Sequence, residues 1–150
     1  MKPHLEPHIF IVFGGTGDLM GRKLLPALYR LRKQNLISER VQILGVARDR
    51  EMTTETYRTW AVDQLSASGI TLEDWADSWC GNSLHFQSIA SGSAEDYRLL
   101  KERVLGLERD HQLPENRLFY LALPPGALEK TATGLGESGY TDGAGWTRLV

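Results

Sequence analysis

An apolar strand that runs into a glycine-rich turn and then into a helix constrains this chain more than any other feature. Residues 9–13 read Ile-Phe-Ile-Val-Phe, an apolar run typical of a strand buried on both faces. Gly14, Gly15 and Gly17 follow, and because they lack a Cβ atom the backbone can turn tightly and let a phosphate approach its N–H groups. The helix predicted after the turn offers unpaired N–H donors and the positive end of its dipole.

Composition is that of one globular domain. Hydrophobic residues make up 41% of the chain and charged residues 24%, and a net charge of −2 gives no sign of a nucleic-acid or membrane partner. Residues 1–8 lack the apolar core of a signal peptide, and the apolar run at 118–123 is too short to span a bilayer. Cys80 is the single cysteine, which excludes an internal disulfide and a cysteine metal cluster. We therefore expect a cytoplasmic protein.

Strands and helices alternate along the chain. We predict strands at residues 9–13, 41–47, 84–89, 117–123 and 146–150. We predict helices at residues 24–33, 54–65, 72–79, 94–107 and 126–137. Helix-length segments between strands imply right-handed crossovers, and so an α/β fold of the Rossmann type, a doubly wound parallel sheet with helices on both faces.

Two local features modify this prediction. Pro26 is tolerated only in the first turn of a helix, so the regular helix should start near residues 23–25 and residues 18–22 should form an irregular turn. Residues 146–150 have the pattern of a buried strand, and we expect the chain to be a fragment of a longer protein.

The four histidines, His4, His8, His85 and His111, form no ligand-spaced pair. We therefore predict no metal site and interpret them as surface or hydrogen-bonded residues.

Four candidate binding segments follow the predicted strands, at the edge of the sheet where α/β folds bind ligands. They are residues 14–17, Arg48, residues 90–91 and residues 124–125. An arginine at the end of the second strand can bind a 2′-phosphate bidentately and favours NADP over NAD. The alternative is that Arg48 is a solvated strand-end charge, and the adjacent Asp49 could still bind a ribose.

The residues around the glycine turn allow more than one role. Thr16 can donate its hydroxyl group to a phosphate or cap the turn, and Arg22 and Lys23 can face the pyrophosphate or be exposed helix-start cations. Asp18 beside a phosphate would be repelled, so we expect it to accept backbone N–H groups and fix the turn. Residues 124–125, Pro-Pro, form either part of the nicotinamide site or a stiff connector.

Several of these segments together resemble the glucose-6-phosphate dehydrogenase family. The resemblance lies in residues 13–19, 22–29, 45–48, 117–125 and 145–150, and so extends over the whole chain. It implies an enzyme that oxidises glucose 6-phosphate to 6-phosphoglucono-δ-lactone with NADP⁺ at the entry of the pentose phosphate pathway. It also implies that the parent enzyme is a homo-oligomer, of which residues 1–150 supply the NADP-binding domain.

The resemblance assigns cofactor contacts residue by residue. The pyrophosphate would lie against Gly14, Gly15, Thr16, Gly17, Asp18, Leu19, Met20, Gly21, Arg22 and Lys23. Arg48 would bind the 2′-phosphate, and Ala90 and Ser91 would lie beside the adenosine ribose and the phosphates, although the family often has an acid at position 90. Pro124 and Pro125 would border the nicotinamide.

The family's catalytic histidine motif and substrate lysines have no counterpart here. Hydride transfer needs a base for the C1 hydroxyl proton, so we expect the chain to bind NADP with little or no turnover. One alternative is a non-catalytic nucleotide-binding or regulatory module. Another is an extended short-chain reductase or epimerase, which the position of Gly21, one residue too late for the third glycine of that class, disfavours.

Overall fold

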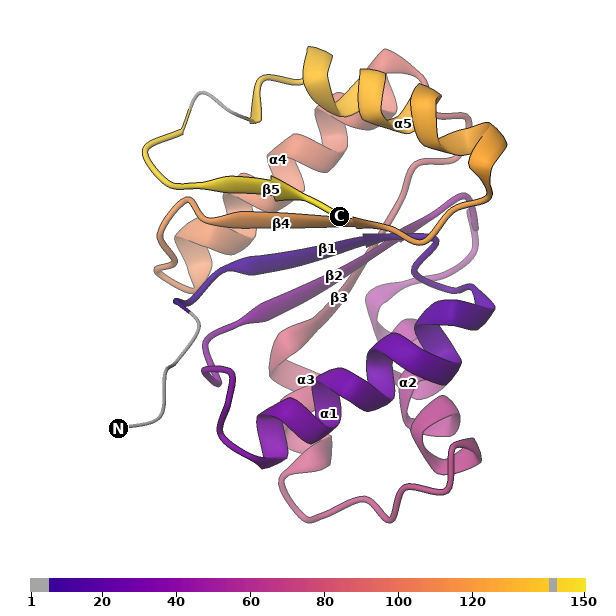
Figure 1. Cartoon of the computed structure of the whole chain (residues 1–150), viewed down its shortest axis with the longest axis vertical. Helices are drawn as coiled ribbons and strands as arrows, with labels where there is room; N and C mark the ends of the chain where they lie inside the picture. Colours follow the sequence, from indigo (N-terminus) through magenta and orange to yellow (C-terminus); the bar gives the residue numbers. More distant parts are fainter. Residues whose placement is uncertain (1–5, 141–142) are drawn as a thin grey trace.

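A parallel sheet forms the centre of the structure, a computed structural model that describes residues 6–140 and 143–150 (Figure 1). Its strands are β1 (Ile9–Phe13), β2 (Gln42–Ala47), β3 (Leu84–Ser88), β4 (Arg117–Leu121) and β5 (Thr147–Leu149). Every pairing is parallel, and the spatial order is β3-β2-β1-β4-β5. This order, in which the chain builds outward from β1 to each edge in turn, confirms the predicted doubly wound sheet.

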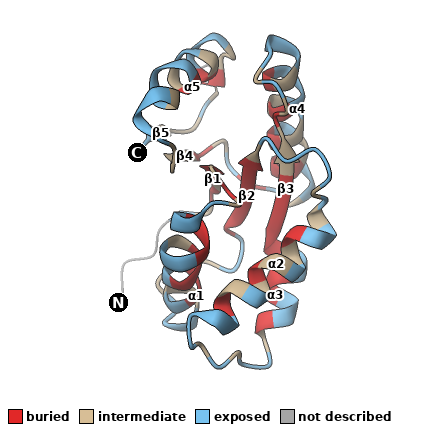
Figure 2. Ribbon diagram, turned by 90° about the vertical axis from the view of Figure 1, so that its right-hand side faces the viewer, coloured by how far each residue is buried: buried red, intermediate tan, exposed pale blue. Residues whose placement is uncertain are grey.

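Helices cover both faces of the sheet (Figure 2). One face carries α1 (Leu25–Lys33), α2 (Thr54–Ala67) and α3 (Ala76–Ser83), and the other carries α4 (Ala94–Asp110) and α5 (Pro125–Glu137). None of the helices traced through residues 6–140 and 143–150 combines the length and the apolar character needed to cross a lipid bilayer.

The central strand β1 belongs to both hydrophobic cores. Val12 is fully buried among side chains of the α1–α3 face, while Ile11 and Phe13 are fully buried on the α4–α5 face. Because successive side chains of a strand point to opposite faces, an uninterrupted apolar run is what such a strand requires. The prediction of a strand buried on both sides is therefore confirmed.

Capping interactions fix the starts of two long helices. The Thr53 and Thr56 side chains each accept the other's backbone N–H at the start of α2. Ser93 and Asp96 form the same reciprocal pair at the start of α4. The sheet-facing side of α4 is built from residues three or four positions apart, which are Tyr97, Leu100, Val104 and Leu107.

The regular helix after the glycine turn begins at Leu25, within the predicted range, and helical backbone precedes it. Asp18 and Leu19 are already helical, a π-helical turn η1 (Met20–Leu24) follows, and α1 continues from it. The Leu25 N–H donates to the carbonyl of Met20, five residues back. A proline ring at position 26 would clash with the carbonyl four residues before it in a regular α-helix, and the wider turn relieves that crowding. The predicted start of the regular helix is therefore confirmed, and the irregular segment before it is a π-helical turn at residues 20–24 in place of the turn expected at residues 18–22.

The helix predicted at residues 72–79 lies at residues 76–83 instead and runs directly into β3. Contacts with α1 explain the shift. The Trp75 ring stacks on Tyr29 with ring centroids 4.8 Å apart, and the Glu73 N–H donates to the Tyr29 hydroxyl oxygen at 3.0 Å. These tertiary contacts hold the preceding segment outside the helix.

Buried polar side chains at the amino-terminal end of the sheet are paired with one another. The guanidinium of Arg117 donates to both carboxylate oxygens of Glu108, at 2.9 and 2.8 Å, and to the carbonyl of Tyr140 at 2.9 Å. The side chains of this ion pair are only 3% and 6% exposed, and hydrogen bonding to Glu108 raises the pKa of Arg117. The network joins β4, α4 and the segment after α5.

The described histidines lie at the same end. His85 Nε2 is 2.7 Å from Gln42 Oε1, and burial lowers the pKa of His85 to about 3, so its ring is neutral at pH 7. His8 is buried against the Glu6 carbonyl, and His111 is half-buried. These placements agree with the prediction of surface or hydrogen-bonded histidines, while His4 lies outside the described residues.

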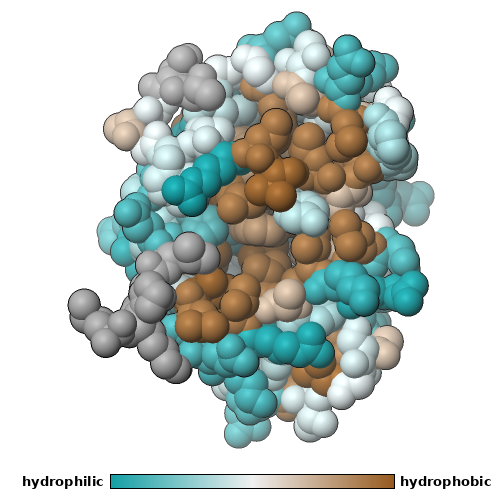
Figure 3. Space-filling view, in the orientation of Figure 1, coloured by the Kyte–Doolittle hydropathy of each residue, from teal (hydrophilic) through white to brown (hydrophobic). Residues whose placement is uncertain are grey.

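Apolar side chains also gather on the molecular face that carries β5 (Figure 3). Leu149 and Val150 at that edge are 55% and 63% exposed, and Leu128 on the neighbouring α5 is 36% exposed. An apolar sheet edge of this kind is a surface for association with other chains or segments.

Candidate coenzyme site

The predicted site residues meet at the carboxyl ends of the strands. Gly14 links β1 to the turn with φ +81°, a backbone conformation that residues other than glycine rarely adopt. A Cβ atom at Gly14 would lie 2.2 Å from the carbonyl oxygen of Ala122, which follows β4. Position 14 therefore requires glycine for both its dihedral angle and its close approach to the β4 end.

The hydrogen bonds of the turn separate engaged amides from available ones. Gly14 and Gly15 both donate their N–H groups to the Val46 carbonyl, at 2.9 and 3.0 Å, and Gly17 donates to Gly14 at 3.0 Å. The N–H groups of Thr16, Asp18 and Leu19 have no acceptor among residues 6–140 and 143–150. The donors offered to a ligand are thus those of Thr16 and the helix start, and the glycines shape the loop that presents them.

Met20 and Gly21 contribute to this loop from inside the protein. Met20 is fully buried in the core of the α1–α3 face, and a Cβ atom at Gly21 would lie 2.4 Å from Gln64 Oε1 of α2. Leu19, in contrast, is 41% exposed. Met20 and Gly21 therefore support the turn from inside, and neither presents a side chain to its outer surface.

The Asp18 carboxylate does not cap the turn as predicted. Its Oδ2 accepts from Arg22 Nη1 at 3.1 Å, and both side chains are largely exposed. No backbone N–H of the described residues donates to it, although the N–H groups of Thr16, Asp18 and Leu19 have no other acceptor there. The pair neutralises a negative charge beside the helix start and holds a guanidinium there.

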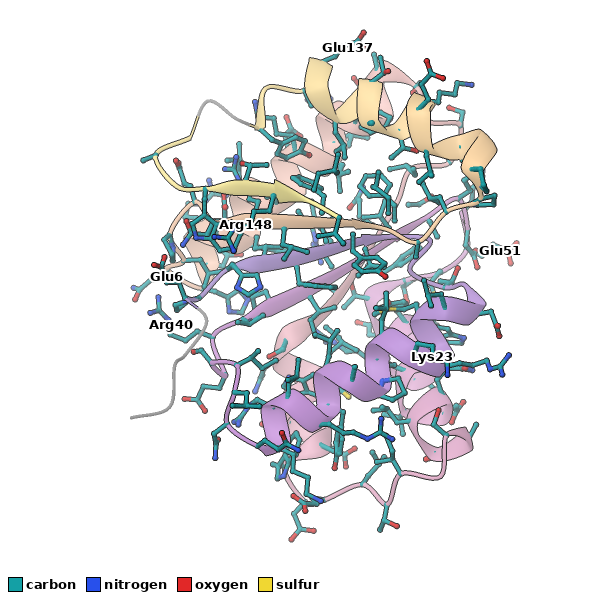
Figure 4. The ribbon with its side chains drawn as sticks, viewed as in Figure 1. Glu6, Lys23, Arg40, Glu51, Glu137 and Arg148 are labelled. Atoms are coloured by element: carbon teal, nitrogen blue, oxygen red, sulfur yellow. The ribbon has the colours of Figure 1, made fainter. Side chains whose placement is uncertain are left out.

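A cavity of about 1230 Å³ opens between α4, α5 and the carboxyl ends of β1 and β2. Four predicted site residues line it, namely Gly14, Arg48, Ser91 and Pro124. Asp18, Arg22 and Lys23 line a separate depression of about 480 Å³ with Gln64. Lys23 projects outward from this end of the molecule, opposite to Glu6, Arg40 and Arg148 (Figure 4).

The other predicted residues, which are Gly15, Thr16, Gly17, Leu19, Met20, Gly21, Ala90 and Pro125, line neither space.

Arg48 is exposed directly after β2, and its guanidinium has no hydrogen bond or ion pair among residues 6–140 and 143–150. The neighbouring Asp49 is occupied, since its Oδ1 accepts the N–H groups of Glu51 and Met52 at 2.9 and 3.1 Å. The free charge at this strand end is therefore the guanidinium, and the carboxylate stabilises the following turn.

The segment after β3 is organised by the start of α4. Both the N–H and the hydroxyl of Ser91 donate to Asp96 Oδ2, at 3.1 and 2.9 Å. Ala90 has φ +25°, and its N–H donates to Ser88 Oγ at 3.1 Å. Because the hydroxyl hydrogen of Ser91 is donated to Asp96, the Ser91 hydroxyl can only accept a hydrogen bond from a ligand.

The Pro-Pro pair begins α5. Pro124 is the N-cap residue and Pro125 the first helical residue, where a missing N–H removes no intrahelical bond. Both residues are exposed, and Pro124 lies at the cavity wall. The pair is a rigid connector, and Pro124 alone borders the cavity, while the place of both residues beside the nicotinamide stays a prediction.

Comparison with known proteins assigns this arrangement to a family. Residues 11–150 match the family model described as glucose-6-phosphate dehydrogenase, NAD binding domain. The chain belongs to the glucose-6-phosphate dehydrogenase family. It is 33% identical to glucose-6-phosphate 1-dehydrogenase of Chlamydia pneumoniae, over 96% of this chain and 29% of that protein. It is also 33% identical to the Bacillus subtilis enzyme, over 100% of this chain and 30% of that protein.

Solved structures show the same relationship. The chain superposes with a TM-score of 0.83 and 27% identity on glucose-6-phosphate dehydrogenase in complex with its substrate glucose 6-phosphate, covering 99% of this chain and 31% of the other. The fold is also shared with glucose-6-phosphate 1-dehydrogenase from Mycobacterium avium, at a TM-score of 0.77 and 23% identity. The chain spans about 30% of the length of the curated relatives it matches.

Within this dehydrogenase domain, two residues that hold the turn were missed by sequence reasoning. The Tyr57 hydroxyl donates to the Gly15 carbonyl at 2.8 Å inside the protein. Gly45 makes room for it, since a Cβ atom there would lie 2.4 Å from the phenol oxygen. A glycine inside an otherwise apolar strand is a signal of close approach, so Gly45 could have been found, whereas its partner could not.

Proposed function

We propose that this chain binds the coenzyme NADP⁺ for an enzyme that oxidises glucose 6-phosphate to 6-phosphoglucono-δ-lactone. The observation that carries the proposal is the pairing of two features at one end of the sheet. The N–H groups of Thr16, Asp18 and Leu19 lie at a helix start without acceptors in the described part of the chain, and Arg48 at the end of the adjacent strand lacks a partner there too.

These groups match the chemistry of a dinucleotide that carries a 2′-phosphate. Unpaired N–H groups and the helix dipole stabilise the negative charge of a pyrophosphate. A guanidinium binds a phosphate monoester bidentately, and it offers no acceptor to the ribose hydroxyl of NAD⁺. When bound, the coenzyme supplies the nicotinamide ring that accepts a hydride from the sugar.

We further propose that binding, and not turnover, is the property of this chain alone. His8, His85 and His111 lie at the amino-terminal end of the sheet, away from the turn, and His85 is held neutral and buried. The proposal expects no glucose-6-phosphate-dependent formation of NADPH by the purified chain. Appearance of NADPH absorbance at 340 nm would contradict it.

The cellular setting follows from the family and is part of the same proposal. Cys80 is buried, and burial raises the pKa of its thiol to about 11, so it is an unreactive core residue. We propose that the parent enzyme acts in the cytoplasm as a homo-oligomer and supplies NADPH at the entry of the pentose phosphate pathway.

Titration of the chain with NADP⁺ and NAD⁺, followed by tryptophan fluorescence, tests coenzyme binding. We expect saturable binding that is tighter for NADP⁺. Arg48→Ala should remove this preference, because the 2′-phosphate loses its bidentate partner, and Arg30→Ala on the exposed surface of α1 is the control for loss of one positive charge. A folded chain that binds neither coenzyme, or an Arg48→Ala variant that keeps the preference, would refute the assignment.

A further inference from the structure

Tyr57 connects α2 to the glycine turn through a contact that is closed to solvent. Its ring is fully buried, and its hydroxyl donates to the Gly15 carbonyl at 2.8 Å. Gly15 in turn lies against Gly45, since a Cβ atom at position 15 would be 2.7 Å from the Gly45 Cα atom. The phenol and the two glycines therefore fit together with no space for a side chain at either glycine.

The Tyr57 ring has one orientation and one protonation state. It packs against Trp60 and Phe86, with ring centroids 5.4 and 5.3 Å away. Burial raises the pKa of Tyr57 far above its usual range, so the hydroxyl carries its hydrogen at neutral pH. The Gly15 carbonyl therefore always faces a donor in a fixed position.

Because the peptide group is planar, the orientation of the Gly15 carbonyl also fixes the orientation of the Thr16 N–H. In a trans peptide the C=O of one residue and the N–H of the next point in opposite directions, and no cis peptide bond occurs in the described residues. Since the Gly15 carbonyl points toward Tyr57 on α2, the Thr16 N–H points away from α2. That N–H is one of the donors without an acceptor in the described part of the chain.

We infer that Tyr57 is a positioning residue, which orients the Gly15–Thr16 peptide so that the Thr16 N–H donates to the pyrophosphate of the coenzyme. The inference rests on the proposed coenzyme binding and adds to it a residue that never touches the ligand. Without the phenol hydroxyl, the Gly15 carbonyl has no partner in the interior, and the peptide is free to rotate.

Tyr57→Phe removes the hydroxyl and keeps the ring. Tyr29→Phe is the matched control, because Tyr29 is also buried and its oxygen accepts one backbone N–H, from Glu73 at 3.0 Å, far from the turn. Affinity is measured for three probes, which are NADP⁺, ADP and adenosine 2′-monophosphate. The first two carry a pyrophosphate group, and the third carries only the 2′-phosphate.

We expect Tyr57→Phe to weaken NADP⁺ and ADP by about tenfold, the size of one misdirected hydrogen bond to a charged group, and to change adenosine 2′-monophosphate less than twofold. Tyr29→Phe should change none of the three by more than about twofold, since it removes a hydrogen bond of similar kind at a distance. Equal weakening of all three probes by Tyr57→Phe, or no weakening, would overturn the inference. Failure of the wild-type chain to bind NADP⁺ would instead refute the proposed function.

A second measurement on the wild-type chain needs no variant. In ¹⁵N-labelled protein, ADP should shift the Thr16 amide proton downfield more than those of Gly14 and Gly15, which already donate to Val46. This outcome would support the inference even if Tyr57→Phe folds poorly. Larger shifts at Gly14 and Gly15, with Thr16 unchanged, would contradict it.

Discussion

The polar groups at the two ends of the parallel sheet differ in whether they have hydrogen-bonding partners within the protein. At the amino-terminal end, Arg117 and Glu108 are buried and bonded to each other, and His85 is bonded to Gln42. At the carboxyl-terminal end, Arg48 and the amides that open the first helix have no partner within residues 6–140 and 143–150. Buried polar groups that lack partners cost stability, whereas exposed ones remain available to a ligand.

The polar groups at one end of the sheet therefore stabilise the fold, whereas those at the other end are available for binding. The amino-terminal contacts join α4, β4 and the segment after α5, so their loss should be felt in unfolding. The carboxyl-terminal groups contribute little to the folded chain by itself, so their loss should be felt only when a ligand is present. Variants at the two ends test this separation.

The largest effect is expected for Glu108→Gln. The substitution leaves the buried Arg117 cation without its carboxylate, and breaking one side of a buried ion pair costs about 3–5 kcal/mol. Denaturant unfolding followed by circular dichroism measures the change. Glu102→Gln, an exposed residue of the same helix that pairs with Arg98, is the control and should cost less than about 1 kcal/mol. Similar losses for the two variants would remove the contrast between buried and exposed charge.

Gly14→Ala should lower the free energy of unfolding by about 2–4 kcal/mol. Alanine is strained at the φ of +81° that residue 14 adopts, and its Cβ atom would lie 2.2 Å from the Ala122 carbonyl oxygen. Gly69→Ala separates the two causes, since Gly69 has φ +79° with nothing within 4 Å of the added atom. Thermal unfolding should show a loss of about 1 kcal/mol for Gly69→Ala, from the backbone conformation alone. Equal losses would mean that the close approach to β4 contributes nothing.

Acid should destabilise the chain through its buried histidines. The pKa of His85 is near 3 in the folded chain and about 6.5 when unfolded, so below pH 6.5 the unfolded state binds the additional proton. The free energy of unfolding should fall by at most about 1.4 kcal/mol per pH unit for this group as the pH decreases from 6.5 toward 3. His8, whose pKa burial also lowers, adds in the same direction.

His85→Leu should reduce that slope, and urea unfolding at several pH values measures it. The packing change of the variant is determined at pH 8, where the histidine is neutral in both states, and is subtracted. A slope identical to that of the wild type would exclude His85 as a source of acid sensitivity.

The smallest effect on stability is expected for Arg48→Ala. Its exposed guanidinium has no partner in the described part of the chain, so the free energy of unfolding should change by less than about 0.5 kcal/mol. Denaturant unfolding without coenzyme measures this value. A substantial loss would show that Arg48 also stabilises the fold and would weaken the separation of the two ends.

Features that depend on local pattern were predictable from the sequence. The apolar run before Gly14 predicted a central strand because a strand covered on both faces needs apolar side chains in both directions. Alternation of strands with helices predicted the parallel sheet, and this placed Arg48, Ser91 and Pro124 at one edge. Topology alone therefore brought these candidates together.

Features that depend on contacts between distant residues were not predictable. The shift of α3 results from packing of Trp75 on Tyr29. The Tyr57 hydroxyl meets Gly15 across 42 positions of sequence, and no local pattern indicates that pairing. Hydrophobic periodicity reports which side of an element is buried, but not which buried atoms meet.

The fit of Tyr57 against Gly45 also restricts how chains with this arrangement can change over time. A side chain at position 45 and a phenol at position 57 would occupy the same space, since the Cβ atom alone would lie 2.4 Å from the hydroxyl oxygen. Enlarging residue 45 first would displace the ring, so a smaller residue must appear at position 57 before or with it. We expect relatives to vary at these two positions together, so that no relative combines a side chain at position 45 with a tyrosine at position 57.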